Sequence, residues 1–396
     1  MTSLSQVLAE CFQPRPVLPE VRARRERLCA FARRHEARLF DVTHPRAAEV
    51  RALLGWDDET MAAFIDSPLL CHSSPHASMN SFPPMMAFPW IFARAIDQAQ
   101  RQHGVPAVHV RNQCTHHDFN DTFSKPHAWW HRGPGGEVVK TKVFTRLPIK
   151  YHPMLSKAAP RLSGEPMRDT DSAAIALAEL GTNYASYCVI YRMYLERLAG
   201  FHMDNRVIEF PIDLLNRFTI GEIGMLPWFA LMDGAALALR QELDNAPMER
   251  LSEDGARELD RYLREQRDSG QDSPWLERAV IAPNMINFSQ FYLLGLSLML
   301  GGRAMAGYVP EMNATIEKLT SGIEGWQSEP PAFLPVTTVP VAELLGLGEE
   351  AARSQAEYGI STTLSLVASA RGAGAGPGLD PLLAGDYRDL YPDSAT

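Results

Sequence analysis

Two short β-type runs with one helical run between them constrain the fold of this chain more than any other feature. Residues 68–72 (PLLCH) predict a short apolar strand, residues 85–102 predict a helix that ends before Gly104, and residues 105–110 predict a second strand. This order is that of a βαβ unit, which predicts a parallel sheet with a right-handed crossover. We therefore expect an α/β fold.

The rest of the chain predicts a core that is divided by a helical insertion. We expect a helical N-terminal segment (1–65), a first part of the α/β core (66–160), a large helical insertion (161–275), a second part of the core (276–370) and a flexible Gly-rich tail (371–396). Residues 133–150 alternate apolar and polar after a Gly-rich turn, which predicts a hairpin or an edge strand. Residues 288–305 are apolar but short for a membrane span, and they predict a buried helix.

Composition and charge exclude several classes of protein. The chain is 45% hydrophobic and 21% charged, as in ordinary soluble globular proteins. Its 38 Lys and Arg against 47 Asp and Glu give a net charge of -9, which disfavours nucleic acid as a partner. The five cysteines form no C-x-x-C pair, and the N-terminus has no signal-peptide pattern. We expect a cytoplasmic protein with small-molecule substrates and no membrane partner, and a homodimer stays open.

Histidines gather where the two predicted strands end. Eight of the twelve lie between His72 and His131, in groups that directly follow each strand. Open α/β sheets bind ligands at the carboxyl ends of their strands, and imidazoles beside carboxylates suit general acid–base chemistry. The catalytic candidates are His116, His117, Asp118 and Asp121. Each of them is also explained as a solvated loop residue, or as a helix cap in the case of Asp118.

Further polar residues and glycines are candidates for binding the substrate. Asn112 and Gln113, at the end of the second strand, have amides that can hydrogen-bond an amino acid. Lys125 and Arg146 can neutralise a carboxylate or phosphate. The remaining candidates are His72, His76, Gly302 and Tyr308.

Two other chemistries and one binding role compete with this interpretation. His72, His76, His116, His117 and Asp121 are residue types that bind zinc or iron, which predicts a metal-dependent enzyme, although no H-E-x-x-H motif is present and we assign no metal ligand. His116-His117-x-x-x-Asp121 resembles the acyl-transferring condensation domains of nonribosomal peptide assembly, except that Thr122 replaces the usual Gly. The aromatic and Met-rich residues 82–90 predict either a docking surface or the core face of a helix.

A longer resemblance covers residues 71–121. The strand, the Ser/His/Pro loop, the helix, the run His103-Gly-Val-Pro-Ala-Val-His-Val and the sequence His117-Asp-Phe-Asn-Asp together resemble the bacillithiol biosynthesis cysteine-adding enzymes. A fainter likeness lies in residues 300–308, a Gly-rich turn followed by Tyr308.

This resemblance implies a Rossmann-like core related to nucleotidyltransferases, and a ligase- or transferase-like activity that joins an amino acid, cysteine in that family, to an acceptor. It also implies a nucleotide, ATP or ADP, as cofactor. No P-loop or G-x-G-x-x-G motif indicates a nucleotide directly, so this expectation comes from the resemblance alone. In this scheme His117 accepts a proton from the attacking amine or thiol, and Asp118 or Asp121 orients it.

Overall fold

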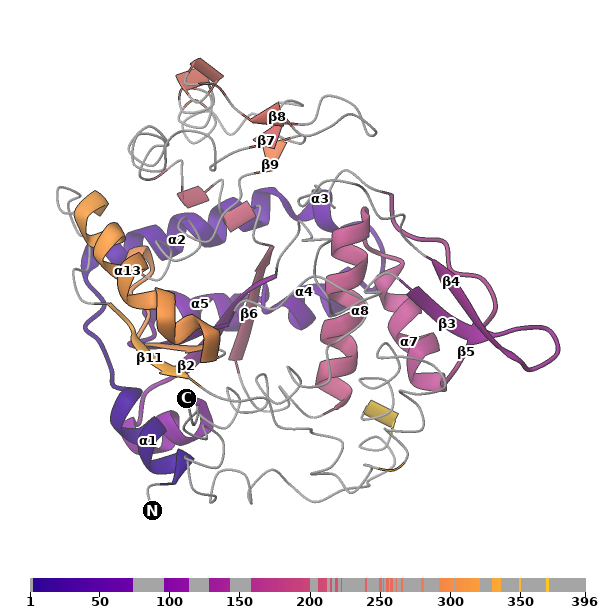
Figure 1. The fold of residues 1–396 in the computed structure, drawn as a ribbon, viewed down its shortest axis with the longest axis horizontal. Coiled ribbons are helices and arrows are strands. Elements are labelled where there is room, and N and C mark those ends of the chain that lie inside the picture. The colour runs from indigo at the N-terminus through magenta and orange to yellow at the C-terminus, as the bar shows by residue number, and fades with distance from the viewer. Residues whose placement is uncertain are drawn as a thin grey trace.

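The structure is a computed structural model. It describes residues 3–73, 96–113, 128–142, 158–199, 206–211, 292–301, 303–320 and 330–335, together with isolated residues and pairs between 214 and 280 and at 349 and 368–369. Figure 1 shows these parts as coloured ribbon.

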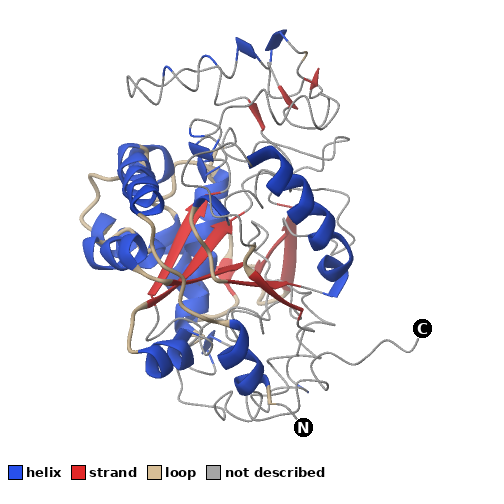
Figure 2. Cartoon of the chain, turned by 90° about the vertical axis from the view of Figure 1, so that its left-hand side faces the viewer, coloured by secondary structure: helices blue, strands red, loops and turns tan. Residues whose placement is uncertain are grey.

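A sheet of five parallel strands forms the centre of the fold (Figure 2). Its strands are β1 (Leu69–Ser73), β2 (Ala107–Gln113), β6 (Arg206–Pro211), β10 (Leu298–Gly301) and β11 (Ala332–Pro335). Across the sheet they are ordered β11-β10-β1-β2-β6. The chain therefore adds β2 and β6 on one side of β1 and then returns to add β10 and β11 on the other. The predicted α/β class is confirmed.

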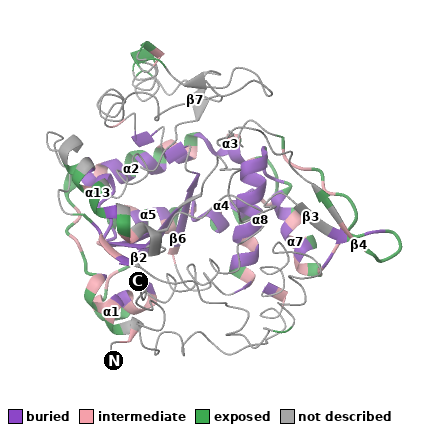
Figure 3. Cartoon of the chain, in the orientation of Figure 1, coloured by how far each residue is buried: buried purple, intermediate pink, exposed green. Residues whose placement is uncertain are grey.

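The central strands β1, β2 and β10 are buried at every position whose burial is described. All of Leu69, Leu70, Cys71 and His72 in β1 are buried, and so are Ala107, Val108, His109 and Val110 in β2 (Figure 3). Parallel strands that are covered on both faces need apolar residues at successive positions, not at every second one. This explains why short, nearly continuous apolar runs predict these strands.

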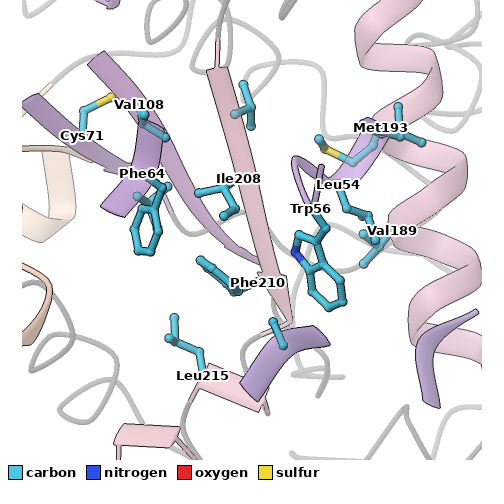
Figure 4. Packing of buried hydrophobic residues seen from close by; sticks show 14 of the residues in the cluster. Leu54, Trp56, Phe64, Cys71, Val108, Val189, Met193, Ile208, Phe210 and Leu215 are labelled. Atoms are coloured by element: carbon cyan, nitrogen blue, oxygen red, sulfur yellow. The ribbon is translucent and has the colours of Figure 1, made fainter. Parts of the chain in front are cut away.

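Helices cover both faces of the sheet. Phe210 of β6 packs against Phe64 of α5 (Asp58–Asp66), with ring centroids 5.6 Å apart (Figure 4). The preceding residue, Glu209, points to the other face, because successive side chains of a strand alternate. There it meets Arg111 of β2, which forms an ion pair with Glu196 of α8 (Tyr184–Leu198). Helices α5 and α8 thus lie on opposite faces.

The N-terminal part is helical, as the sequence predicts. It contains α1 (Leu4–Cys11), α2 (Pro19–Arg34), α3 (Glu36–Leu39) and α4 (Ala47–Leu54), followed by α5. Asp57 caps α5 by accepting a hydrogen bond from the Thr60 amide at 2.8 Å. Gly55 ends α4 with a positive φ of 72°, and a Cβ there would lie 1.9 Å from the carbonyl oxygen of Val207. Only glycine fits this close approach of α4 to β6.

One buried arginine connects three of these elements. Arg25 of α2 donates to the backbone oxygens of Phe64, Ile65 and Ser67 at the end of α5, and to those of Leu294 and Gly295 ahead of β10. Burial lowers its pKa to about 9. The carbonyl dipoles compensate a charge that is costly to remove from water.

Between β2 and β6 the chain leaves the central sheet. Strands β3 (Ala128–Arg132), β4 (Val138–Lys142) and β5 (Glu165–Pro166) form a small antiparallel sheet at the edge of the molecule (Figure 1). Of residues 133–150, which predict a hairpin or an edge strand, β4 follows the Gly-rich turn and pairs with β3, which lies ahead of this range; residues 143–150 lie outside the described residues. Helices α7 (Asp169–Ala178) and α8 follow, and residues 96–103 are helical directly before β2, as expected.

Other described elements complete the list. Strands β7 (Leu239–Arg240), β8 (Glu249–Arg250) and β9 (Ala279–Val280) form a third, antiparallel sheet. Helix α13 (Arg303–Thr320) follows β10 and precedes β11.

Two sequence-based expectations about secondary structure are wrong. Residues 161–275 are not wholly helical, because β6 lies within them and belongs to the central sheet. Residues 288–305 do not form one buried helix: within them the chain turns at Gly295, forms β10 and begins α13. A strand that is apolar on both faces cannot be told from a buried helix by periodicity alone.

Two further properties concern the described residues only. Cys11, Cys29, Cys71 and Cys188 form no disulfide. No described helix combines the length and the apolar character that crossing a bilayer requires.

Candidate functional site

The carboxyl ends of β1, β2 and β10 lie together at one edge of the central sheet. In the parallel register, His72 lies beside Val110 of β2 and Met299 of β10, and Ser73 lies beside Arg111. Strand β2 extends two residues further, through Asn112 and Gln113. We call the ends formed by His72–Ser73, Asn112–Gln113 and Gly301 the strand-end site.

The structure places four of the candidate residues. His72 is on β1, Asn112 and Gln113 are the last two residues of β2, and Tyr308 is on α13. The other candidates lie outside the described residues: His76, His116, His117, Asp118, Asp121, Lys125, Arg146 and Gly302. For all of them except Arg146, which follows β4, the segment starts at the strand-end site, because 74 follows β1, 114 follows β2 and 302 follows β10. The structure thus brings together the origins of the segments that carry these residues.

His72 is a neutral imidazole in the core of the sheet. Its side chain is buried, with the residue 3% exposed. Burial lowers its pKa to about 3, although a hydrogen bond to the backbone of Val110 acts in the opposite direction. At neutral pH it therefore contributes no charge. It can orient groups through hydrogen bonds but is a weak proton acceptor, so a general base must come from elsewhere.

A buried charge cluster lies directly behind the end of β2. Arg111 of β2 pairs with Glu196 of α8, and its Nε lies 3.2 Å from Oε2 of Glu209 on β6. Arg192, one turn before Glu196 on α8, donates from Nε to Oε1 of Glu196 at 2.7 Å. The four side chains carry two positive and two negative charges, and none is more than 7% exposed.

The ion pairs determine how these groups titrate. Burial acts to lower the pKa of Arg111, but the negative charges of Glu196 and Glu209 outweigh it, and the pKa is raised. For Arg192 burial prevails, although Glu196 acts against it, and the pKa is lowered. Both arginines stay protonated at neutral pH, because an arginine keeps its proton far above that range.

Sequence reasoning missed this cluster, although a signal for it exists. Arg111 follows Val-His-Val in β2, and Glu209 stands between Ile208 and Phe210 in β6. A charged residue inside an apolar strand needs a partner, since burying an isolated charge is costly. Two such strands with opposite charges predict a cross-strand pair, and the register confirms it by placing Arg111 beside Glu209.

The N-terminus of α13 also faces this edge. Strand β10 ends at Gly301, and α13 begins at Arg303 and continues for 18 residues. The first turn of a helix presents backbone N–H groups that no carbonyl of the helix accepts, and the helix dipole favours negative charge there. This end of α13 is suited to phosphate or carboxylate groups.

Metal binding finds no support among the residues that the structure describes. No group of three or more His, Cys, Asp or Glu side chains in these segments is arranged to hold an ion. Apart from His72, the residues of the predicted metal site lie outside them.

Comparison with known proteins gives no relative from which a role could be transferred. No protein-family model matches the chain, and no curated protein matches it.

Proposed function

We propose that this chain is an intracellular biosynthetic enzyme that joins an amino acid of the cysteine type, or a similar nucleophile, to a small-molecule acceptor. The reaction is that of a ligase or transferase, and it takes place at the strand-end site. One observation carries the proposal: the strand order reverses between β1 and β10, so the chain leaves these neighbouring strands in opposite directions. Open α/β sheets bind ligands at such a reversal, beyond the carboxyl ends of the strands.

The core is proposed to be Rossmann-like and related to that of nucleotidyltransferases. Numbered in chain order, the five strands run 5-4-1-2-3 across the sheet, which is the order of one such doubly wound arrangement. The resemblance to the cysteine-adding enzymes supports this assignment. It also implies ATP or ADP as cofactor, and the backbone around Gly301 and the first turn of α13 suit its phosphates. When bound, the nucleotide would supply phosphate groups, which the N-terminus of α13 can bind.

The chain's own residues supply binding and proton transfer. Asn112 and Gln113 are placed where strand β2 ends, so their amides are proposed to bind the amino-acid substrate. His117 takes the proton from the attacking amine or thiol, and Asp118 or Asp121 orients its imidazole. Lys125 and Arg146 neutralise carboxylate or phosphate. His72 remains uncharged and orients the end of β1.

Ligand binding is the first test. The midpoint of thermal unfolding is measured against the standard amino acids, ATP and ADP, because a ligand that binds only the folded state raises it. We expect cysteine or a related amino acid to raise the midpoint and ADP to raise it further. A protein that responds to none of these compounds contradicts the proposal.

The site itself is tested by substitution. Asn112→Ala combined with Gln113→Ala should abolish the shift caused by the amino acid, and His117→Ala should abolish turnover while leaving the unfolding midpoint unchanged. His44→Ala is the matched control, because His44 is exposed in the loop before α4. Full turnover by His117→Ala removes the assigned base.

A further inference from the structure

Burying the charge cluster requires free energy, because its four side chains are removed from water. Arg111, Arg192, Glu196 and Glu209 are all withdrawn from water, yet replacing a buried ion network by well-packed apolar residues is often neutral or stabilising. On the same face of the sheet, Val207 of β6 is buried, and so is Met193 of α8, whose Sδ accepts a hydrogen bond from Arg111 at 3.1 Å. Stability alone therefore does not account for four charged side chains at this position.

What the cluster does offer is a fixed geometry. The guanidinium of Arg111 is held from two directions, by Glu209 on the neighbouring strand and by Glu196 on the helix that covers the sheet. Arg192 in turn holds the second oxygen of Glu196. The hydrogen bond to Glu196 is directional and defines the orientation of the planar guanidinium, and the ion pair with Glu209 at 3.2 Å adds attraction from the neighbouring strand. The backbone of β2 at Arg111 is thereby fixed relative to both β6 and α8.

The position of Arg111 in the strand gives this geometry a use. Asn112 and Gln113 are the next two residues, and the segment with the catalytic candidates begins immediately afterwards. Among the described residues, β1 pairs with β2 as far as Arg111, and β6 pairs with the next two residues through Phe210 and Pro211. The pairing with β6 and the anchoring of Arg111 thus both act on the last two residues of β2.

We infer that the charge cluster is a positioning device for the end of β2: it holds the backbone of Asn112 and Gln113 in the geometry that substrate binding needs. Its contribution is to local order at the strand-end site, and the apolar core provides the stability of the sheet. The link to substrate rests on the proposed function. The inference that the cluster orders the end of β2 is independent of that function.

Amide hydrogen exchange tests the local ordering without any ligand. In the variant Arg111→Met/Arg192→Met/Glu196→Leu/Glu209→Leu, we expect exchange in a peptide covering 107–113 to accelerate by about tenfold or more, as for the loss of a coupled contact. Peptides covering β10 and β11 should exchange at the wild-type rate, and the unfolding midpoint should stay equal or rise. Unchanged exchange at 107–113, or acceleration throughout the sheet with a lowered midpoint, overturns the inference.

Arg111→Lys is the second variant, and it keeps the charge in case the fourfold variant does not fold. A lysine ammonium is a compact point charge and lacks the planar set of donors by which Arg111 contacts Glu196 and Glu209. We expect a wild-type midpoint, faster exchange at 107–113 and a several-fold weaker response of the midpoint to cysteine. The control is Glu36→Gln, which disturbs the ion pairs of Glu36 with Arg33 and Arg51 far from β2 in the chain and should change neither readout.

The outcomes separate the two proposals. If Arg111→Lys exchanges and responds to cysteine as the wild type does, the positioning role is refuted. If the wild type itself responds to neither cysteine nor ADP, the proposed function fails, and the exchange at 107–113 still decides whether the cluster orders the end of β2.

Discussion

Removing Arg25 should destabilise the protein far more than removing another arginine of the same helix. Arg25 is buried, and its guanidinium donates to five backbone carbonyl oxygens in two segments. In Arg25→Ala these oxygens lose their donor. Arg22 lies one turn earlier in α2, but its contacts to Glu26 and Asp66 are exposed.

The magnitude follows from these contacts. A hydrogen bond to a charged group contributes about 1.5–3 kcal/mol, and a buried carbonyl left without a donor costs about 1–3 kcal/mol. The variant also no longer has to bury a guanidinium, and water can enter the space, so the sum over five oxygens is an upper limit. Breaking a buried charged contact typically costs about 3–5 kcal/mol, and we expect about 4 kcal/mol for Arg25→Ala. For Arg22→Ala we expect a much smaller loss, because its ion pairs are exposed to water.

Urea unfolding followed by tryptophan fluorescence measures both free energies of unfolding. Arg25→Lys should fall between Arg25→Ala and the wild type, because an ammonium has fewer donors than a guanidinium. A loss for Arg25→Ala no greater than that for Arg22→Ala would refute the idea that this side chain holds the end of α5 against the segment before β10.

Two further predictions follow from single residues. The pKa of His72 is about 3 in the folded state and about 6.5 in the unfolded state, so between these pH values the unfolded state binds one more proton. The free energy of unfolding therefore decreases as the pH falls from 6.5 towards 3, by up to about 1.4 kcal/mol per pH unit. Urea unfolding of His72→Leu should show a shallower acid dependence than the wild type, and equal slopes would contradict the lowered pKa. In the same assay, Gly55→Ala should lower the free energy of unfolding by more than about 3 kcal/mol, because the new Cβ would meet the carbonyl oxygen of Val207. Gly104 also has a positive φ but nothing within 4 Å, so Gly104→Ala should lower it by only about 1 kcal/mol. Similar losses for the two variants would show that α4 moves to relieve this contact.

The parts of the fold that could be predicted from sequence are those in which local pattern and burial agree. Strand β1, strand β2 and the helix before Gly104 follow from their apolar runs and their turn residues, and the N-terminal helices follow from periodicity. Strand β6 could not be found in the same way, because its six residues stand between segments of helical character. Strand β10 could not be told from a buried helix, because all of its residues are apolar and show no alternation.

The candidate site, too, could be predicted from the sequence only in part. That polar residues follow β1 and β2 is visible in the sequence, and the parallel register brings these ends to one edge. A charged residue inside each of two apolar runs indicates that Arg111 and Glu209 need partners, but the contact with Glu196 is between segments far apart in the chain, and no local pattern identifies it. The acid–base roles of His116, His117, Asp118 and Asp121 stay predictions, because these residues lie outside the described segments.

The strand order has a consequence for synthesis of the chain on the ribosome. Strand β1 is complete at Ser73, but one of its two neighbours, β10, is complete only at Gly301. At roughly 5–20 residues per second, β10 follows β1 by roughly ten seconds or more. During this time one edge of an apolar strand has no native partner, and such edges pair readily with other chains. We expect the nascent chain to depend on chaperones until the last two strands have emerged.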